Sequence, residues 1–592
     1  MVKKIFFWIF FAGTIACSLD AYNDARNLVI LYTHDLHSNF KPFPVTENNT
    51  TFIVGGYARL ATAIKHEQQG AGGAQNCVVV DAGDFTGGSL FQTIFPAYAS
   101  EIITMGAMGY DVMTFGNHDF DFGHAGLASA LHAAVKSKQK LPKFVASNML
   151  IDNKNPLLNG FGHAYTTYPI VKTVVLERAG LKIGILGLLG VEAATYASDA
   201  APIKFNNYID VAQRIVTDLR QNKKVDVIIC LSHAGLSKDG KFDEDRQLAQ
   251  QVPGIDVIIS AHKHAIIDEQ EDTTFIVACG QYGRYLGRLE ITCNADKTVS
   301  KVSNQRIPID SKFVEDKHVA ELIDSFEKKI DGDYLQRFGY AHNRILAYCP
   351  TPLDASNGLA QLVTDAFIYA LKTVEGVNFI KPELTLEAYG HLRFYLPKGD
   401  ITVADVLRVL PLGSGPDGTS GYPLVTFWLT GKEIKNLLEI ETTISQDKSE
   451  MHLEINGMQL TYDPEAPRYH RVTKIDVETD KGLRPLDDDK QYRVCTSWHL
   501  LLIRDYLKKT SGGVINFTPK NDRKKVIAHL QTTCEMNGIL ELKEWFALAL
   551  YLSNLPKDPL THDGLATIPN SYQKPKARIF KVVKEKKEKQ VS

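Results

Sequence analysis

Acidic, amide and imidazole side chains recur where short apolar segments end in the first half of the sequence. A lone Asp at such a point is usually a turn or cap residue, and a lone His is usually a packed or surface residue. A series of strand ends that offers only Asp, Asn and His is therefore informative as a set. The residues are Asp35, His37, Asp84, Asn117, His118, His233, His262 and His264.

These residue types suit a site for two divalent metal ions. Imidazole and carboxylate together favour first-row divalent ions, a carboxylate can bridge two ions, and an Asn carbonyl completes a ligand shell without adding charge. No cysteine belongs to the set, which disfavours a structural zinc site. The ligands do not choose among Zn²⁺, Mn²⁺, Co²⁺ and Mg²⁺.

The elements that must position these side chains form an alternating pattern, which predicts an α/β fold. In open α/β sheets, ligands bind beyond the carboxyl ends of the strands, where the set lies. We expect strands at 28–33, 77–80, 112–115, 182–188, 225–231 and 257–260, with helices at 57–68 and 211–221. An amphipathic helical stretch at 313–336 precedes a second α/β or α+β unit with a helix at 359–371 and strands near 384, 424–429 and 453–462.

Length and composition agree with two large soluble domains. The chain has 592 residues, 44% of them hydrophobic and 23% charged, too many for one ordinary core. The net charge of −2 provides no basic field, so no nucleic-acid partner is expected. Cys77 and Cys230 lie in apolar runs and are interpreted as core thiols.

The N-terminus has the pattern of an export signal. Lys3 and Lys4 precede an apolar run from residue 5 to 16, which is too short to span a membrane. We expect an exported protein that is periplasmic, secreted or anchored to the cell envelope. Residues 14–17 resemble a lipobox, in which Cys17 would carry a lipid tether, and cleavage near Ala21 would instead release a soluble protein.

Several motifs resemble those of the calcineurin-like metallophosphoesterases. They are Asp35-Leu36-His37, Gly83-Asp84, Gly116-Asn117-His118-Asp119, Ser232-His233 and Ala261-His262-Lys263-His264. The longer strings at 55–59, 116–121 and 252–256 resemble the 5′-nucleotidase and UDP-sugar hydrolase family. This resemblance implies a metallophosphoesterase domain of two sheets flanked by helices at 26–312 and a substrate-binding domain at 341–580. The sequence pattern itself predicts a signal peptide at 1–21, a helical linker at 313–340 and a charged tail at 581–592.

The resemblance also implies roles for individual residues. One metal ion would take Asp35, His37, Asp84 and His264, and the other would take Asp84, Asn117, His233 and His262, with Asp84 as the bridge. A hydroxide held between the two ions would attack phosphorus in line. His118 and Asp121 match the catalytic dyad, in which Asp121 would orient the His118 ring. His34 stands where the family has Asn and receives no role.

The second domain selects the nucleoside in this family, and here the match is patchy. Arg393 matches a substrate-binding Arg, while Ala388 replaces an Asn and Asp354 stands where an Arg is expected. The segment that supplies a base-stacking ring aligns with residues 450–452, which contain no Phe. Trp498 and Tyr506 are nearby aromatic residues that fit a core role better.

The predicted function is therefore release of phosphate from nucleotides, with a role in nucleotide breakdown. Two alternatives remain open. The substrate could be a cyclic nucleotide, a nucleotide sugar or a sugar phosphate, since the base clamp does not carry over. A non-catalytic surface protein that captures a ligand with the same fold is the alternative from another class, and the complete ligand set argues against it.

Overall fold

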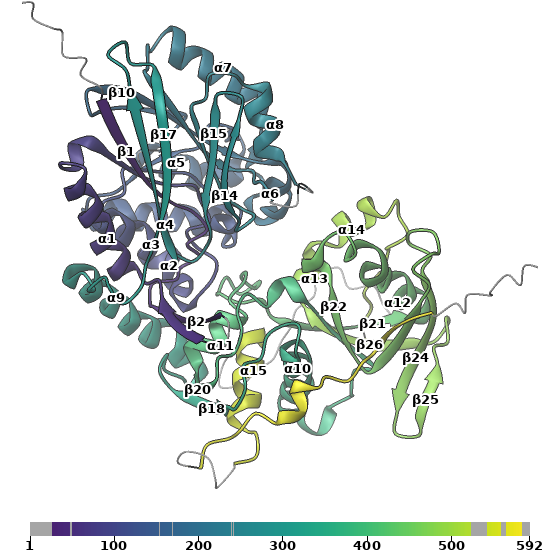
Figure 1. The fold of residues 1–592 in the computed structure, drawn as a ribbon. Coiled ribbons are helices and arrows are strands. Elements are labelled where there is room, and N and C mark those ends of the chain that lie inside the picture. The colour runs from purple at the N-terminus through teal and green to yellow at the C-terminus, as the bar shows by residue number, and fades with distance from the viewer. Residues whose placement is uncertain are drawn as a thin grey trace, which may run out of the picture.

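The computed structural model describes residues 26–582 except 48–49, 153, 169, 238–239, 241, 522–540 and 558–563. Figure 1 shows two units, an N-terminal one in purple to teal and a C-terminal one in green to yellow. The predicted signal segment, Cys17 and most of the charged tail lie outside the described residues. Among the described residues, no helix combines the length and apolar character needed to cross a bilayer.

Two mixed sheets form the centre of the N-terminal unit (Figure 1). One has the order β17 (Val299–Pro308), β16 (Tyr285–Cys293), β1 (Arg26–Thr33), β4 (Cys77–Asp81), β5 (Val112–Met113), β6 (Lys143–Val145) and β8 (Ile170–Val171). The other has the order β14 (Ile266–Glu271), β15 (Thr274–Cys279), β13 (Val257–Ser260), β12 (Val227–His233), β10 (Leu181–Leu189) and β9 (Thr173–Arg178).

The facing sides of these sheets form one apolar core. Ile30 and Val80 of the first sheet share a cluster with Ile185 and Ile229 of the second. Helices cover the outer sides: α1 (Tyr57–Gly70), α3 (Ser100–Met108) and α4 (Gly123–Ser137) on the first sheet, and α7 (Tyr208–Gln221) and α8 (Glu244–Gln251) on the second. Burial on both faces explains why the strands are continuous apolar runs.

The predicted α/β layered fold is confirmed, with differences at element ends. The third strand ends at Met113 instead of Phe115, because the chain turns there into the loop that carries Asn117. The fifth strand extends to His233, so this residue is the last of β12. Cys77 and Cys230 are buried free thiols in strands, as expected.

Helix α9 (Lys317–Lys329) fills most of the predicted amphipathic stretch. A π-helical turn (Ile330–Tyr334) and a 3-10 turn (Leu335–Phe338) follow it without a break. Val319, Ile323 and Phe326 are its buried residues, and they join a cluster that also contains residues of the C-terminal unit. The stretch therefore packs against the core of the molecule along one face.

The C-terminal unit contains two four-stranded sheets. The first has the order β21 (Leu424–Thr430), β26 (Gln491–Ser497), β19 (Leu384–Ala388) and β22 (Leu453–Asn456), and the second β25 (Gly482–Pro485), β24 (Val472–Thr479), β23 (Met458–Tyr462) and β27 (Ile579–Lys581). Helices α10 (Leu359–Glu375) and α15 (Glu544–Ser553) pack against each other.

The single strand predicted at 453–462 is two strands in the structure, β22 and β23. The segment 453–462 divides at Gly457, whose φ is +92° and where a Cβ atom would collide with the Glu383 carbonyl. Glycine tolerates both the left-handed backbone and the close approach. The chain can therefore leave the first sheet at Asn456 and enter the second at Met458.

Candidate metal centre and active-site cleft

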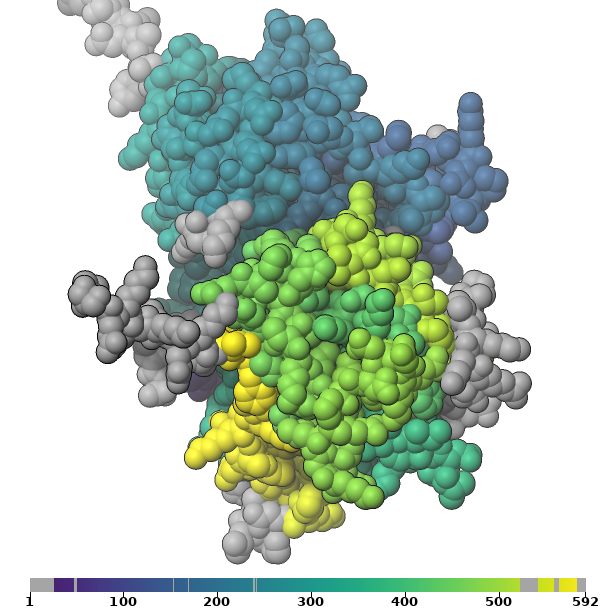
Figure 2. Space-filling model, turned by 90° about the vertical axis from the view of Figure 1, so that its right-hand side faces the viewer, coloured from purple at the N-terminus to yellow at the C-terminus, as the bar shows by residue number. Residues whose placement is uncertain are grey.

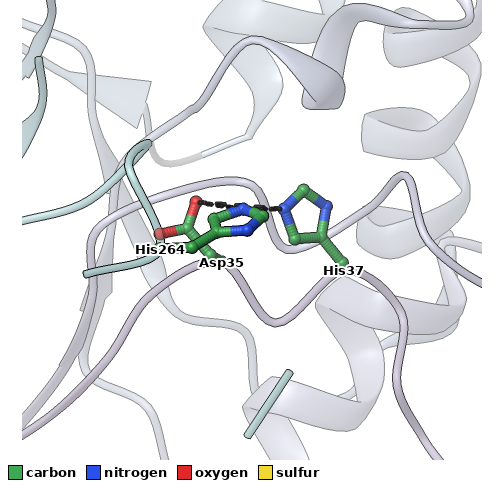
Figure 3. A group of neighbouring side chains, drawn as sticks. All are labelled: Asp35, His37 and His264. Carbon is green, nitrogen blue, oxygen red and sulfur yellow. Dashed lines mark hydrogen bonds and ion pairs between the residues drawn. The ribbon is translucent and has the colours of Figure 1, made fainter. Parts of the chain in front are cut away.

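The side chains predicted from the strand ends gather at one edge of the two sheets. Asp35, His37 and His264 form the first cluster (Figure 3). His37 Nε2 lies 3.0 Å from His264 Nε2, and Asp35 Oδ1 lies 3.9 Å and 3.7 Å from these two nitrogens. The carboxyl ends of β1 and β13 supply these residues from opposite sheets.

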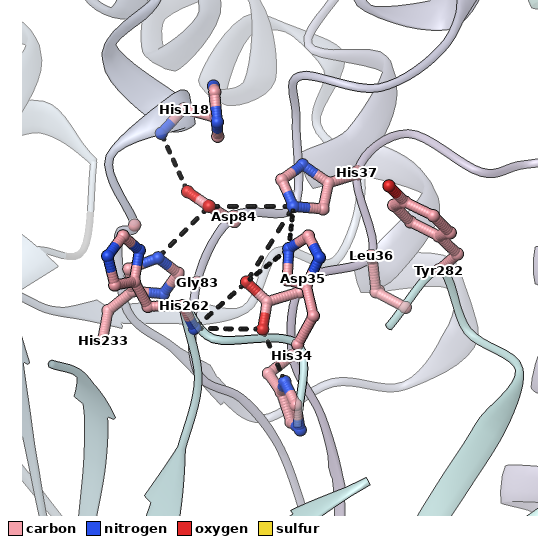
Figure 4. A network of polar contacts seen from close by, with 12 residues as sticks. His34, Asp35, Leu36, His37, Gly83, Asp84, His118, His233, His262 and Tyr282 are labelled. Carbon is pink, nitrogen blue, oxygen red and sulfur yellow. Dashed lines mark hydrogen bonds and ion pairs between the residues drawn. The ribbon is translucent and has the colours of Figure 1, made fainter. Parts of the chain in front are cut away.

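A second cluster, Asp84, His233 and His262, lies beside the first (Figure 4). Asp84 Oδ2 is 3.2 Å from His233 Nε2 and 3.7 Å from His37 Nε2, so one carboxylate faces both clusters. The structure thus places Asp84 where a bridging ligand would lie. Gly116 permits this packing, because a Cβ atom there would collide with Asp84 and His233.

The hydrogen bonds of the imidazoles test whether these residues fit metal ions. His37 Nδ1 donates to the Thr86 carbonyl at 3.0 Å, and His233 Nδ1 donates to the Ala82 carbonyl at 2.9 Å. Each ring therefore directs Nε2 toward the cluster, which is the atom that would bind a metal ion. His233 Nε2 and Asn117 Oδ1 are buried without a hydrogen-bond partner. The donor set fits two divalent ions.

The backbone of this site is unusual for residues with side chains. Asp35, His37, Asp84, His262 and His264 all have φ between 48° and 74°. Left-handed backbone at such residues costs about 1–3 kcal/mol each and persists where the surrounding structure enforces it. Backbone hydrogen bonds from Asp35 N to the Gly83 carbonyl and from His37 N to the Asp84 carbonyl, both 2.9 Å, enforce it here.

The charge states of His37, His264 and Asp84 agree with a metal-binding role. Burial, reinforced by the charge of Arg393, holds the pKa of His37 and His264 well below the usual value, so both are neutral. Burial opposes ionisation of Asp84, but His233 and His118 outweigh it and keep the pKa of Asp84 well below its usual range. Neutral imidazoles and an ionised carboxylate are the forms that bind metal. His233 differs, because the charge of Asp84 outweighs burial and raises the pKa of His233 to about 9, so a metal ion bound there would displace a proton.

His118 and Asp121 lie at the rim of the two clusters. His118 Nδ1 is 3.0 Å from Asp121 Oδ2, and the His118 amide donates to Asp84 Oδ1 at 2.8 Å. The pKa of His118 is raised because Asp121 and Asp84 outweigh the effect of burial. The structure brings the two predicted dyad residues together, and their catalytic roles stay predictions.

Two supporting residues were not predicted. His34 received no role from sequence, yet its Nδ1 lies 2.7 Å from Asp35 Oδ2 while its Nε2 accepts the Cys279 amide at 2.8 Å. Asp119 accepts the amides of Asp84, Thr86 and Gly116 at 2.7–3.0 Å. Both residues hold the loops that carry the candidate ligands. Asp119 belongs to the motif at 116–119, in which sequence analysis assigned roles only to Asn117 and His118.

A third unpredicted residue connects the two units. Glu192, on α6 (Val191–Tyr196), accepts from His262 Nε2 at 3.3 Å, from Lys448 Nζ at 2.8 Å and from Lys263. Lys448 belongs to the C-terminal unit and also bonds the Tyr196 hydroxyl at 2.9 Å. Glu192 therefore orients a candidate ligand and contacts the second unit. Sequence offers no signal for it, because its partners are far away in the chain.

A cleft of about 530 Å³ separates this centre from the C-terminal unit. Figure 2 shows the green C-terminal unit in front of the teal N-terminal unit. The wall of the cleft that the N-terminal unit supplies includes Asp84, Asn117, His118, Asp121, His262 and His264. The wall that the C-terminal unit supplies includes Arg393, Met451, Tyr422, His499 and Tyr506.

The structure places the two aromatic residues singled out from sequence differently with respect to the cleft. Trp498 and Tyr506 are both partly buried and pack against the apolar cluster of the C-terminal unit, and Tyr506 also lines the cleft. The core interpretation therefore fits both residues, and for Tyr506 it is incomplete. Met451 lines the cleft within the segment that lacks the expected ring. The backbone of Arg393 is held by Tyr282, whose hydroxyl donates to the Arg393 carbonyl at 3.2 Å.

Known proteins share both units. Residues 28–265 match the calcineurin-like phosphoesterase family, and residues 342–507 match the C-terminal domain of 5′-nucleotidases. The trifunctional nucleotide phosphoesterase YfkN of Bacillus subtilis is 27% identical over 445 residues, which are 71% of this chain and 29% of that protein. An apyrase of Tabanus yao is 25% identical over 547 residues, covering 86% of this chain and 89% of that protein.

Among solved structures, a 5′-nucleotidase precursor from Thermus thermophilus superposes with a TM-score of 0.68 at 22% identity, over 94% of this chain and all of that chain. This likeness establishes the common fold. The two family matches follow each other in the chain, and the first includes every candidate metal ligand. The chain therefore belongs to the 5′-nucleotidase family, with a calcineurin-like phosphoesterase domain and a 5′-nucleotidase C-terminal domain, and is a phosphoesterase hydrolase.

Proposed function

We propose that this protein releases phosphate from nucleotides at the cleft between its two units. The observation that carries the proposal is the pair of clusters that face the same carboxylate, Asp84, with His118 beside them at the cleft wall. Asp35, His37 and His264 would hold one divalent ion, and Asn117, His233 and His262 the other, with Asp84 shared. The ions would supply charge that polarises a phosphoryl group and lowers the pKa of bound water.

The chain's own residues provide the rest of the chemistry. His118 lines the cleft and would donate a hydrogen bond or a proton to the phosphoryl or leaving oxygen. Asp121 accepts from His118 Nδ1 and so keeps Nε2 available for this contact. Arg393, on the opposite wall, would bind substrate oxygens, since its guanidinium is a permanent cation with several donors.

We propose nucleoside monophosphates as substrates, with weak discrimination between bases. Tyr506 and Tyr422 offer aromatic surface to the cleft, while Met451 offers an adaptable apolar side chain. An adaptable wall accepts purine and pyrimidine rings alike, because phosphate and sugar supply most of the binding. The relatives named for apyrase and trifunctional phosphoesterase activity make other phosphoesters the second candidate class.

A comparison of substrates tests this proposal. Phosphate release would be measured as kcat/KM for AMP, CMP, UMP, ADP, a UDP-sugar, a 2′,3′-cyclic nucleotide and a sugar phosphate, before and after chelation and with Mn²⁺, Zn²⁺ or Co²⁺ restored. We expect chelator-sensitive activity and less than a hundredfold difference between AMP and CMP, or about 2.7 kcal/mol. Activity confined to the sugar phosphate would refute the nucleotidase proposal. Full activity after complete removal of metal would refute the metal mechanism as well.

We also propose that the protein is exported, on the basis of the Lys-flanked apolar run at the N-terminus. Mass spectrometry of the native N-terminus tests it. A start at Cys17 with a lipid adduct would mean a tethered protein, and a start near Ala21 a soluble one. An intact Met1 in the cytoplasmic fraction would refute export.

A further inference from the structure

A separate cluster of carboxylate and imidazole groups lies in the C-terminal unit. Glu387 is on β19, His391 ends the 3-10 turn that follows it (Tyr389–His391), and Glu544 is the first residue of α15. One ligand atom from each residue can be chosen so that all lie within 4.8 Å of one another. The three residues are only 1%, 6% and 2% exposed.

The hydrogen bonding of this cluster is incomplete within the described part of the chain. His391 Nδ1 lies 2.7 Å from Glu387 Oε1 and 4.0 Å from Glu544 Oε1. Among the described residues, no aligned hydrogen bond is made by His391 Nδ1, Glu387 Oε2 or Glu544 Oε1. Buried polar atoms are nearly always satisfied, since an unsatisfied one costs about 1–3 kcal/mol. Three such atoms in one buried cluster indicate a missing partner.

The carboxylates of this cluster also lack a directly paired Lys or Arg among the described residues. Neither Glu387 nor Glu544 makes an ion pair with Lys or Arg within the described part of the chain; His391 is the partner of both. Lys543, next in sequence to Glu544, is instead bonded to Asp417 at 2.9 Å and Glu541 at 2.7 Å. Two buried carboxylates this close require a cation or a proton between them.

We propose that Glu387, His391 and Glu544 bind one divalent first-row metal ion, distinct from the dinuclear centre. One imidazole and two carboxylates suit Zn²⁺ or Mn²⁺. An ion there would satisfy all three orphan atoms and neutralise the acidic pair. The proposal does not depend on the substrate of the cleft, because the ligands belong to the C-terminal unit.

Such an ion would act on the cleft through two histidines. His391 Nε2 lies 2.8 Å from Nδ1 of His499, a cleft-lining residue. With Nδ1 bound to metal, a neutral His391 carries its proton on Nε2 and donates it to His499 Nδ1. Because His499 Nδ1 then accepts this hydrogen bond, the proton of a neutral His499 ring lies on Nε2. The ion would thereby determine which ring nitrogens of His391 and His499 donate and which accept hydrogen bonds at the C-terminal wall of the cleft.

The experiment counts metal ions in the full-length protein after loading with Mn²⁺ or Zn²⁺ and removal of free ion. In an Asp84→Ala background, which abolishes metal pairing at the dinuclear centre, we expect the ion bound by Glu387, His391 and Glu544 to remain. Adding Glu387→Gln or Glu544→Gln should abolish it, while the matched change Glu439→Gln should not. Glu439 is a buried carboxylate of the same unit, bonded to Thr442 and the Val472 amide.

Crystallography supplies an independent measurement on the unmodified protein. Anomalous scattering at the Mn or Zn edge should give a peak between Glu387, His391 and Glu544, separate from those near Asp84. Loaded crystals without that peak, or an Asp84→Ala protein that retains no ion, would overturn the proposal. In that case a proton shared by the two carboxylates would be the partner. Either result leaves the dinuclear mechanism to be judged separately, by activity and by the metal near Asp84.

Discussion

The His118–Asp121 pair provides a quantitative test of the proposed mechanism. His118→Ala removes a side chain that lines the cleft but is absent from both metal clusters. Loss of a general acid or a hydrogen bond to developing charge lowers turnover by about 10²–10⁴-fold. We therefore expect that loss in kcat with unchanged metal content.

Asp121→Asn is a smaller perturbation of the same pair. It weakens the 3.0 Å contact with His118 Nδ1 while keeping the shape of the side chain. A hydrogen bond to a charged group is worth about 1.5–3 kcal/mol, which corresponds to roughly 10–100-fold in rate. Because Asp121 would act only through His118, the double variant should be no slower than His118→Ala alone.

The assay combines steady-state kinetics on AMP with metal analysis of each variant. His124→Ala is the matched control, since His124 lies on α4 and bonds the Ala201 carbonyl at 3.0 Å. It should keep both activity and metal. Metal loss in His118→Ala would refute the division of roles. Fully multiplicative losses in the double variant would refute the idea that Asp121 acts through His118.

The remaining predictions concern the bridge, the link between units and a buried acid. Asp84→Ala should abolish metal pairing and activity together, measured by metal analysis and phosphate release; an active variant would exclude the bridging role. Glu192→Gln should weaken metal binding by about 10–100-fold, measured by metal titration, because it loosens the orientation of His262; unchanged affinity would contradict this. Burial raises the pKa of Glu101 to about 7, so the folded state holds this proton more tightly than the unfolded chain. The resulting stability is complete below about pH 4.5 and is lost as pH rises through 7. Glu101→Gln should remove this pH-dependent loss of unfolding free energy, which is on the order of 3 kcal/mol near pH 8. Denaturant unfolding of the variant and the unmodified protein across this pH range is the measurement, and the same pH dependence in both would refute the prediction.

The sequence by itself determined the α/β character, the apolar strands and the ligand types of the metal centre. Strands such as β4 and β13 can be recognised from the sequence, because a strand that is buried on both faces is a continuous run of apolar residues. The ligands follow these strands directly, so Asp84 and His262 are recognisable without knowledge of packing. The family resemblance added the division of ligands between two ions, which spacing alone leaves open.

Only the tertiary structure decided which distant side chains meet. Glu192 contacts Lys448, and Glu387 contacts His391 and lies beside Glu544, through the packing of separate elements. Trp498 and Tyr506 both pack against the apolar cluster of the C-terminal unit, but only Tyr506 also lines the cleft. Local sequence fixes an element and its buried face. The partner of a polar side chain depends on how whole units pack, and a local sequence pattern does not specify these long-range contacts.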